Sequence, residues 1–439
     1  MTSETEPVSP RIADLDKALQ SGNAAAPNAF WERMKDEGAP IIEPISGDDD
    51  HSLVTFVWQQ SDGVSEAAVY GPGLAGLFDL LHPLDGTDLF YRTYSRGNDF
   101  RFSYRLALNP PSLRLPLDSE EDLKQLLAYL SNAELVIRDP MNHKAMQIGG
   151  FRDPSRPDEI PPPVFSSVVE LPQAPSQSYL ARRPGIPHGW VHGHRFRSAI
   201  LGNERNIWVY TPPGYAGSDT DYGVLIAFDN AYVTMIPTNN ILDNLLAEGR
   251  VPALIAACVD NPDQPTRSRE LVCHEPFSES LATEILPWLQ ANYRVTSNPA
   301  RVVVAGSSLG GLAAGFVALR HPELYGNVLS QSGSFGWGPG SEPGKPIPEG
   351  YADWQWLAQQ YKSAAALPLR FCLEAGLFET ALVNPDVPRE SDLLLANRRM
   401  HEVLVEKGYE VHYSEFNGGH DYACWRGSLA DGLMALLGT

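Results

Sequence analysis

Residues 302–311, VVVAGSSLGG, decide the fold class of this chain. Three valines favour a strand, the G-x-S-x-G element at 306–310 supplies a turn of small residues, and the apolar run 312–320 predicts a helix. A strand, a sharp turn and a helix in this order can hold a strained serine at the edge of a sheet. We therefore predict an α/β fold with Ser308 as a nucleophile. The alternative is a glycine-rich turn of a nucleotide-binding fold.

A serine hydroxyl needs a base to accept its proton and an acid to orient that base. In this fold class both follow the serine in the chain, and the histidine comes last. His420 lies on a loop after two glycines, just past the alternating, strand-like run 410–416. The other histidines after the serine, His321, His401 and His412, fall in a helix-ending turn, an amphipathic helix and a strand. We predict His420 as the general base, with a structural loop histidine as the alternative.

The acid is expected after the preceding strand, 369–376, at the same edge of the sheet. Glu379 is the nearest carboxylate there, and Asp386 lies further along the loop. The residues leave three alternatives open: Glu379 as the acid, Asp386 as the acid, or a dyad of Ser308 and His420. A solvated loop charge is the structural alternative for Glu379.

Ester cleavage by a serine creates an oxyanion that needs two backbone N–H donors. Leu309 supplies one of them, because the first amides of a helix have no partner within the helix. The second donor is expected where the apolar run 222–228 ends, and either Asn230 or Ala231 fits that position.

Several segments of the second half carry a family pattern: LIAFDNAYV, TRSREL-x-C, VVVAGSSLGGLAAG, NVLSQSGSFGW, LEAGLFE and GGHDYACWRGSL. They resemble the enterochelin (enterobactin) esterases, whose hydrolase domain belongs to the esterase-D-like branch of the α/β-hydrolases. Residues 139–144 and 168–177 are similar to the end of that family's N-terminal domain and to its interdomain segment. The resemblance therefore spans nearly the whole chain.

The resemblance implies that Ser308, Glu379 and His420 form a catalytic triad and that Arg267 matches the arginine of the family's R-x-x-E-L segment. It implies hydrolysis of the ester bonds of enterobactin, a cyclic trilactone of catecholoyl-serine, so that its iron is released. The expected partner is this small molecule, iron-free or as its Fe(III) complex, and no cofactor is expected. The chain departs from the family where it has Asp229 followed by asparagine rather than glycine.

A formal net charge of −21 offers no long-range attraction to an anionic ferric catecholate, so local cations and aromatic rings are expected to bind it. The candidates are Arg267, Arg269, Arg426, Phe335, Trp337, Tyr422 and Trp425. Surface ion pairs are the alternative for the arginines, and core packing is the alternative for the rings.

Two other functions share parts of this pattern. A broader carboxylesterase or acyltransferase of feruloyl-esterase or mycolyltransferase type would have the same fold and triad. A binding protein with an inactive hydrolase domain is the second alternative, which the complete set of Ser308, Glu379 and His420 disfavours.

Composition limits the function classes further. The acidic balance disfavours nucleic acid and anionic membranes as partners. Four cysteines without CxxC spacing disfavour a disulfide framework and a zinc site. His188, His192 and His194 lack an accompanying carboxylate or thiolate, so alternation along a strand explains them better than a metal does. The polar residues 1–10 lead us to expect a cytoplasmic protein, and nothing in the sequence indicates an oligomeric state.

At 439 residues with 43% hydrophobic content, the chain is expected to form two domains. Residues 1–150 are predicted to form a helical stretch followed by a small, immunoglobulin-like β-sandwich with one further helix. Residues 151–187 are proline-rich and are predicted to be an extended linker. From residue 188 to 439 strands and helices alternate, which predicts an α/β-hydrolase domain with a doubly covered, mostly parallel sheet.

Overall fold

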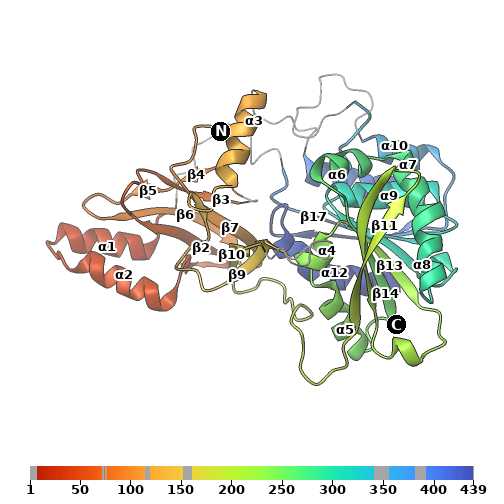
Figure 1. Ribbon diagram of the computed structural model, residues 1–439. Coiled ribbons are helices and arrows are strands. Elements are labelled where there is room, and N and C mark those ends of the chain that lie inside the picture. The colour runs from red at the N-terminus through yellow and green to blue at the C-terminus, as the bar shows by residue number, and fades with distance from the viewer. Residues whose placement is uncertain are drawn as a thin grey trace. The chain divides into compact units, whose positions relative to one another are not determined.

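A computed structural model describes residues 7–71, 74, 77–113, 119–151, 161–340, 355–380 and 392–438 of the chain. The chain divides into two compact units. Figure 1 colours the chain from red at the N-terminus to blue at the C-terminus. The first unit comprises Met1–Gly149, Pro163–Pro175 and Asn417–Ala423. The second comprises Gly150–Pro162, Ser176–Phe416 and Cys424–Thr439.

The first unit begins with two helices, α1 (Pro10–Gln20) and α2 (Ala26–Glu37), which lie side by side at the red end of the chain in Figure 1. The hydroxyl of Ser9 caps α1 by accepting a hydrogen bond from the N–H of Ile12. Apolar residues at helical spacing bury one face of each helix against the strands that follow. The buried residues on these two helices are Ile12, Leu15, Phe30, Trp31 and Met34.

Two antiparallel sheets make up the rest of the first unit. The first sheet has the order β1 (Ile41–Ile45), β2 (Asp48–Gln59), β6 (Leu89–Gly97) and β5 (His82–Pro83). The second has the order β4 (Asp79–Leu80), β3 (Ala67–Tyr70), β7 (Arg101–Leu108), β10 (Val164–Glu170) and β9 (Ala145–Gly149), with β8 (Val136–Ile137) paired to β7. Helix α3 (Glu120–Leu130) precedes β8.

Aromatic residues fill the space between the two sheets. The ring of Phe56, on β2, lies 4.8 Å from that of Tyr104 and 6.0 Å from that of Phe102, both on β7. Edge-to-face packing of this kind buries large side chains from facing strands. The predicted β-sandwich is thereby confirmed.

The predicted linker at residues 151–187 is wrong in its middle part. Strand β10 pairs antiparallel with β7, where Ser167 lies opposite Tyr104, and also with β9. The prolines at 161–163 end just before the strand, so none of them removes an N–H from the ladder. The prolines around the short apolar run therefore do not distinguish a linker from a strand.

The second unit contains one eight-stranded sheet in the order β11-β12-β14-β13-β15-β16-β17-β18. Its strands are β11 (Trp190–Ser198), β12 (Asn203–Thr211), β13 (Gly223–Phe228), β14 (Leu254–Val259), β15 (Val302–Ser307), β16 (Asn327–Gln331), β17 (Arg370–Gly376) and β18 (Glu410–Phe416). Strands β11 and β12 run antiparallel to their neighbours, and all pairs from β14 to β18 are parallel. This mixed sheet matches the predicted α/β-hydrolase fold.

Helices cover the sheet on both faces. They are α4 (Ala231–Thr234), α5 (Thr238–Ala247), α6 (Gln264–Glu270), α7 (Glu275–Ser280), α8 (Leu286–Asn292), α9 (Leu309–Arg320), α10 (Trp356–Ser363), α11 (Leu393–Glu406) and α12 (Tyr422–Leu437). On β16, Val328 belongs to the core cluster that includes α9, whereas the next residue, Leu329, meets Gly432 of α12. Because successive strand residues point to opposite faces, α9 and α12 cover opposite sides of the sheet, as Figure 1 also shows.

All residues of β13, β14, β15 and β16 are buried. The carboxyl ends of these parallel strands meet at one edge of the sheet, where an α/β fold places its functional residues. Within the described residues, no helix is both long and apolar enough to cross a membrane.

Candidate active site

Ser308 occupies the turn between β15 and α9 in a conformation that side-chain-bearing residues rarely adopt, with φ 58° and ψ −122°. Its N–H donates to the carbonyl of Gln331 at 2.9 Å, and its own carbonyl accepts from the N–H of Ser334 at 3.0 Å. Its hydroxyl oxygen lies 3.4 Å from that of Ser334. The neighbouring strand β16 and the loop after it therefore hold the strained residue in place.

The glycines around Ser308 are required by close backbone packing. A Cβ on Gly306 would lie 2.2 Å from the carbonyl carbon of Gly310, and one on Gly310 would lie 2.7 Å from the carbonyl oxygen of Phe228. Real Cβ atoms do not approach other atoms so closely, and backbone atoms cannot move aside cheaply. The G-x-S-x-G pattern is thus explained by a tight turn packed against the end of β13.

Two backbone N–H groups at this edge are suited to bind an oxyanion. Leu309 is the first residue of α9, and Asn230 follows β13, which pairs with β15 through Phe228 and Gly306. No hydrogen-bond acceptor for either N–H occurs in the described part of the chain. The N–H of Ala231, the other candidate, donates instead to the carboxylate of its neighbour Asp229 at 3.1 Å.

Glu379 lies just after β17 and is 7% exposed, which excludes a solvated loop charge. Its Oε1 accepts from the hydroxyl of Ser332 at 2.6 Å and from the N–H of Gly376 at 3.2 Å. The indole of Trp425 donates to the same Ser332 hydroxyl at 2.9 Å. The carboxylate is therefore held at the carboxyl end of the strand next to β16. The other candidate acid, Asp386, lies outside the described residues.

A second buried carboxyl, Glu374, lies on β17. Its Oε1 accepts from the amide of Gln331 at 2.9 Å and from the hydroxyl of Ser428 at 2.6 Å. Burial is the largest cause that raises the pKa of Glu374 to about 7. The backbone carbonyl of Gln331 also accepts from the N–H of Ser308. Gln331 therefore connects this carboxyl to the turn that holds the serine.

Several residues that support the site were not predicted from the sequence, among them Ser332, Gln331 and Glu374. The signal that could have found them is a run of polar side chains at the carboxyl end of an apolar strand, as in NVLSQS. A buried strand tolerates such residues only where they are hydrogen-bonded.

His420 lies between β18 and α12, in the segment Asn417–Ala423 that belongs to the first unit, whereas Ser308 and Glu379 belong to the second. The carbonyl of Asn417 accepts from the N–H of Arg101 on β7 at 3.1 Å. His420 thus lies on a loop past a strand end, as the sequence predicts.

The candidate arginines differ in how far they are engaged. Arg267 donates through Nε to the carboxylate of Asp229, and the two side chains are 17% and 11% exposed. Arg426 donates to the side-chain oxygen of Gln177 at 2.9 Å. The side chain of Arg269 is 57% exposed, with its guanidinium 3.7 Å from Glu270.

The candidate aromatic residues divide by burial. Phe335 and Trp425 are 0% and 2% exposed, which favours core packing for both. Tyr422 packs with Met146 in a small cluster of the first unit. Trp337 is partly exposed, and its ring lies 6.1 Å from that of Trp356 at nearly a right angle.

The histidines near β11 make separate contacts. The ring of His188 is 3.1 Å from the carboxylate of Asp243, and that of His194 is 2.5 Å from the hydroxyl of Tyr293. No cluster of three or more potential metal ligands occurs in the parts of the chain with described coordinates.

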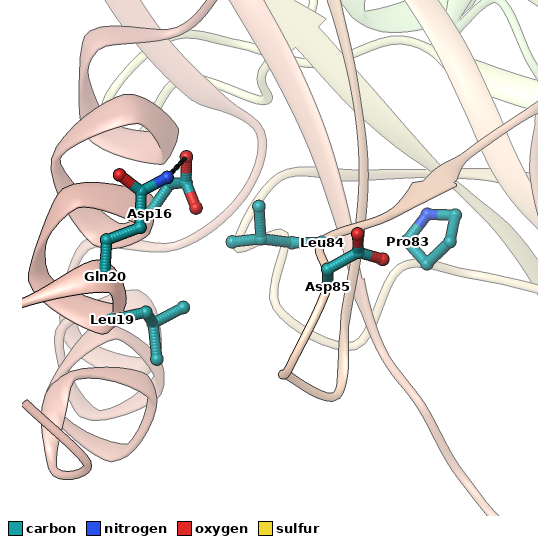
Figure 2. Close-up of a pocket in the computed structure, with 6 residues that line it drawn as sticks. All are labelled: Asp16, Leu19, Gln20, Pro83, Leu84 and Asp85. Carbon is teal, nitrogen blue, oxygen red and sulfur yellow. Dashed lines mark hydrogen bonds between the residues drawn. The ribbon is translucent and has the colours of Figure 1, made fainter. Parts of the chain in front are cut away.

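A pocket of about 580 Å³ lies in the first unit between α1 and the turn after β5 (Figure 2). Figure 2 shows Leu84 pointing toward α1, where Gln20 donates to Asp16 at 2.9 Å. None of the candidate site residues lines this pocket.

Comparisons with known proteins cover both units. Residues 198–436 match the family described as "Putative esterase", and residues 53–180 match the family "Enterochelin esterase, N-terminal". The iron(III) enterobactin esterase of Dickeya dadantii (strain 3937) is 30% identical, over 95% of each chain. The iron(III) salmochelin esterase of Escherichia coli O6:H1 (strain CFT073) is 25% identical, over 97% of this chain and 98% of its own.

Among solved structures, the ferric enterobactin esterase of Salmonella typhimurium is 26% identical and superposes with a TM-score of 0.72, covering 93% of this chain and 98% of its own. The esterase family accounts for more than half of the chain, and the N-terminal family accounts for much of the rest. On this evidence, together with a strained serine in a G-x-S-x-G turn, the chain belongs to the enterochelin esterase family.

Proposed function

We propose that this chain is a serine esterase that hydrolyses the ester bonds of a catecholate trilactone siderophore, as the Fe(III) complex or without iron, and so releases the metal. Relatives named iron(III) enterobactin esterase and iron(III) salmochelin esterase, aligned over nearly the whole chain, support this substrate class. A strained serine at the carboxyl edge of a buried parallel sheet supports the reaction class.

In the proposed reaction, the Oγ of Ser308 attacks the ester carbonyl carbon while His420 accepts the hydroxyl proton. The carbonyl π electrons move to oxygen, and the resulting oxyanion is bound by the N–H groups of Leu309 and Asn230. His420 then gives its proton to the leaving seryl oxygen, and the ester C–O bond breaks. A water molecule, deprotonated by His420, cleaves the acyl-enzyme and restores the serine.

Glu379 is the proposed acid that orients the imidazole of His420. The support for it is its burial and the donors Ser332 and Gly376, which fix a carboxylate at the carboxyl edge of the sheet, two strands from that of the nucleophile. Asn230 is preferred over Ala231 as the second oxyanion donor because the N–H of Ala231 is already paired. Each donor is expected to lower the barrier by about 3 kcal/mol.

Substrate binding needs local positive charge, because the chain as a whole carries −21. We assign Arg269 to direct contact with catecholate oxygens, since its side chain is the most exposed of the three candidate arginines. Arg267 would act closer to the serine, because it fixes Asp229 just before the proposed oxyanion donor. Trp337 is the proposed aromatic contact for a catechol ring.

The observation that carries the proposal is the conformation of Ser308. Mass analysis of the reaction products tests the proposed function. Enterobactin, its ferric complex, a feruloyl ester and a short p-nitrophenyl ester are each incubated with the wild type, Ser308→Ala and Ser307→Ala. Wild type and Ser307→Ala should convert the trilactones to linear products, and Ser308→Ala should bind them without turnover. A clear preference for feruloyl or p-nitrophenyl esters would contradict the substrate class, and turnover by Ser308→Ala would contradict the mechanism.

We also propose a cytoplasmic location for the reaction. The support is that all four cysteines are free thiols. Fractionation of the producing cell with a thiol-trapping reagent tests this location.

A further inference from the structure

The segment that carries His420 is attached to the sandwich on both sides of the histidine. On the first side, the N–H of Arg101 donates to the carbonyl of Asn417 at 3.1 Å. The side-chain amide of Asn417 also donates to Asp99 at 2.6 Å. Gly418 and Gly419 then follow, and glycines by themselves restrict the backbone least.

On the other side, Asp421 is 4% exposed and forms the stronger attachment. One carboxylate oxygen accepts from the hydroxyl of Ser103 at 3.0 Å and from the N–H of Ala423 at 2.9 Å. The second oxygen accepts from the backbone N–H of Ser103. Three donors on one buried carboxylate fix its position, because moving it would leave charge and N–H groups unpaired.

Ser103 lies close to the described pairing between β3 and β7. That pairing runs from Ala67 to Tyr70, and Tyr70 lies opposite Arg105. Ser103 is two residues from Arg105 and therefore presents its N–H on the same edge of β7. Asp421 thus meets β7 two residues beyond the described pairing.

We infer that β7 of the N-terminal sandwich positions the general base, and that Ser103 and Asp421 are positioning residues for His420. This inference rests on the proposed role of His420 in ester hydrolysis. The physical reason is that a general base must be held within a fraction of an ångström of its working position, and the two glycines before His420 cannot do that. Asp421 is covalently adjacent to the histidine, so fixing its carboxylate limits the backbone from which the imidazole projects.

The test compares Ser103→Ala, Ser103→Thr and the matched control Ser167→Ala. Ser167 lies on the adjacent strand β10 and is fully buried, and its hydroxyl accepts from the N–H of Asp139 at 3.0 Å. Replacing Ser167 by alanine therefore removes a comparable buried hydrogen bond that does not involve Asn417–Ala423. Ser103→Ala should lower kcat on the trilactone about tenfold with KM within twofold, and Ser103→Thr, which keeps the hydroxyl, should restore kcat to within about threefold. Ser167→Ala should lower the melting temperature to a similar extent and leave kcat within about twofold.

Labelling of Ser308 by a fluorophosphonate separates this inference from the proposed substrate, since the labelling needs the same base and no siderophore. Ser103→Ala should slow labelling by the same factor by which it lowers kcat. Equal effects of Ser103→Ala and Ser167→Ala on kcat and on labelling would overturn the inference. A wild type that labels quickly but leaves the trilactone intact would overturn only the proposed substrate.

Discussion

Replacement of Glu374 by glutamine should change how stability depends on pH. Burial raises the pKa of this carboxyl from an ordinary 4.5 to about 7, so the folded protein binds its proton more tightly than the unfolded chain does. The contribution of this carboxyl to stability is therefore greatest below pH 4.5, falls as the pH rises toward 7, and levels off above 7. A gap of about 2.5 pH units corresponds to about 3 kcal/mol in total.

Glutamine is neutral at every pH, and its side-chain oxygen can still accept from Gln331 and Ser428, the two donors that Glu374 now has. Any cost of placing the amide is independent of pH. Relative to the Glu374→Gln variant, the wild type should thus lose about 2 of the 3 kcal/mol between pH 5.5 and 8.5. For a unit of this size that is roughly 4–8 °C in melting temperature.

Thermal unfolding at pH 5.5 and 8.5, followed by circular dichroism, measures this difference. The matched control is Glu410→Gln on the neighbouring strand β18, where the side chain is 60% exposed. The control should follow the wild type at both pH values, whereas the stability of Glu374→Gln relative to the wild type should rise by about 2 kcal/mol from pH 5.5 to pH 8.5. If the difference between Glu374→Gln and the wild type stayed constant with pH, or moved in the opposite direction, the carboxyl would not be ionising in a buried site.

Three further substitutions test the geometry around the serine. Gly310→Ala places a Cβ 2.7 Å from the backbone oxygen that ends β13, so we expect kcat to fall at least about 100-fold, measured by steady-state kinetics on folded protein. Arg267→Lys loses the Nε donor to the aspartate after β13; kcat should fall about tenfold, and an unchanged kcat would show that this aspartate needs no guanidinium. Ser332→Ala removes the hydroxyl donor to Glu379, which should cost about 1–3 kcal/mol in urea unfolding and lower kcat more than KM.

The strand, turn and helix around Ser308 could be predicted because local sequence determines them. The spacing of glycines reflects contacts between residues only four apart, as between Gly306 and Gly310. The order of strands and helices in the second half follows from hydrophobic patterning, which is also local. Glu379 could be placed as well, because it directly follows a strand that the pattern marks clearly.

Strand β10 could not be predicted because its stability comes from partners distant in sequence. Val168 lies opposite Ser103, 65 residues earlier in the chain, and prolines flank the strand on both sides. The same limitation applies to the aromatic candidates. Whether Phe335 lines a pocket or fills the core depends on α9, against which its ring packs next to Gly315, and periodicity alone does not reveal that contact.

The supporting network also depends on distant pairs. Trp425 reaches Ser332 across 93 residues, and Asp421 reaches Ser103 across 318. Each of these polar groups looks like an ordinary loop or strand residue in the sequence. Their buried hydrogen bonds become visible only when the strands are assembled.

The central claim is that Ser308 is the nucleophile, and mass mapping of a covalent adduct tests it most directly. The wild type is treated with a fluorophosphonate, digested, and searched for the modified peptide. The account predicts a single adduct on Ser308 that is absent from Ser308→Ala. An unmodified Ser308, or an adduct on another serine that persists in Ser308→Ala, would contradict it.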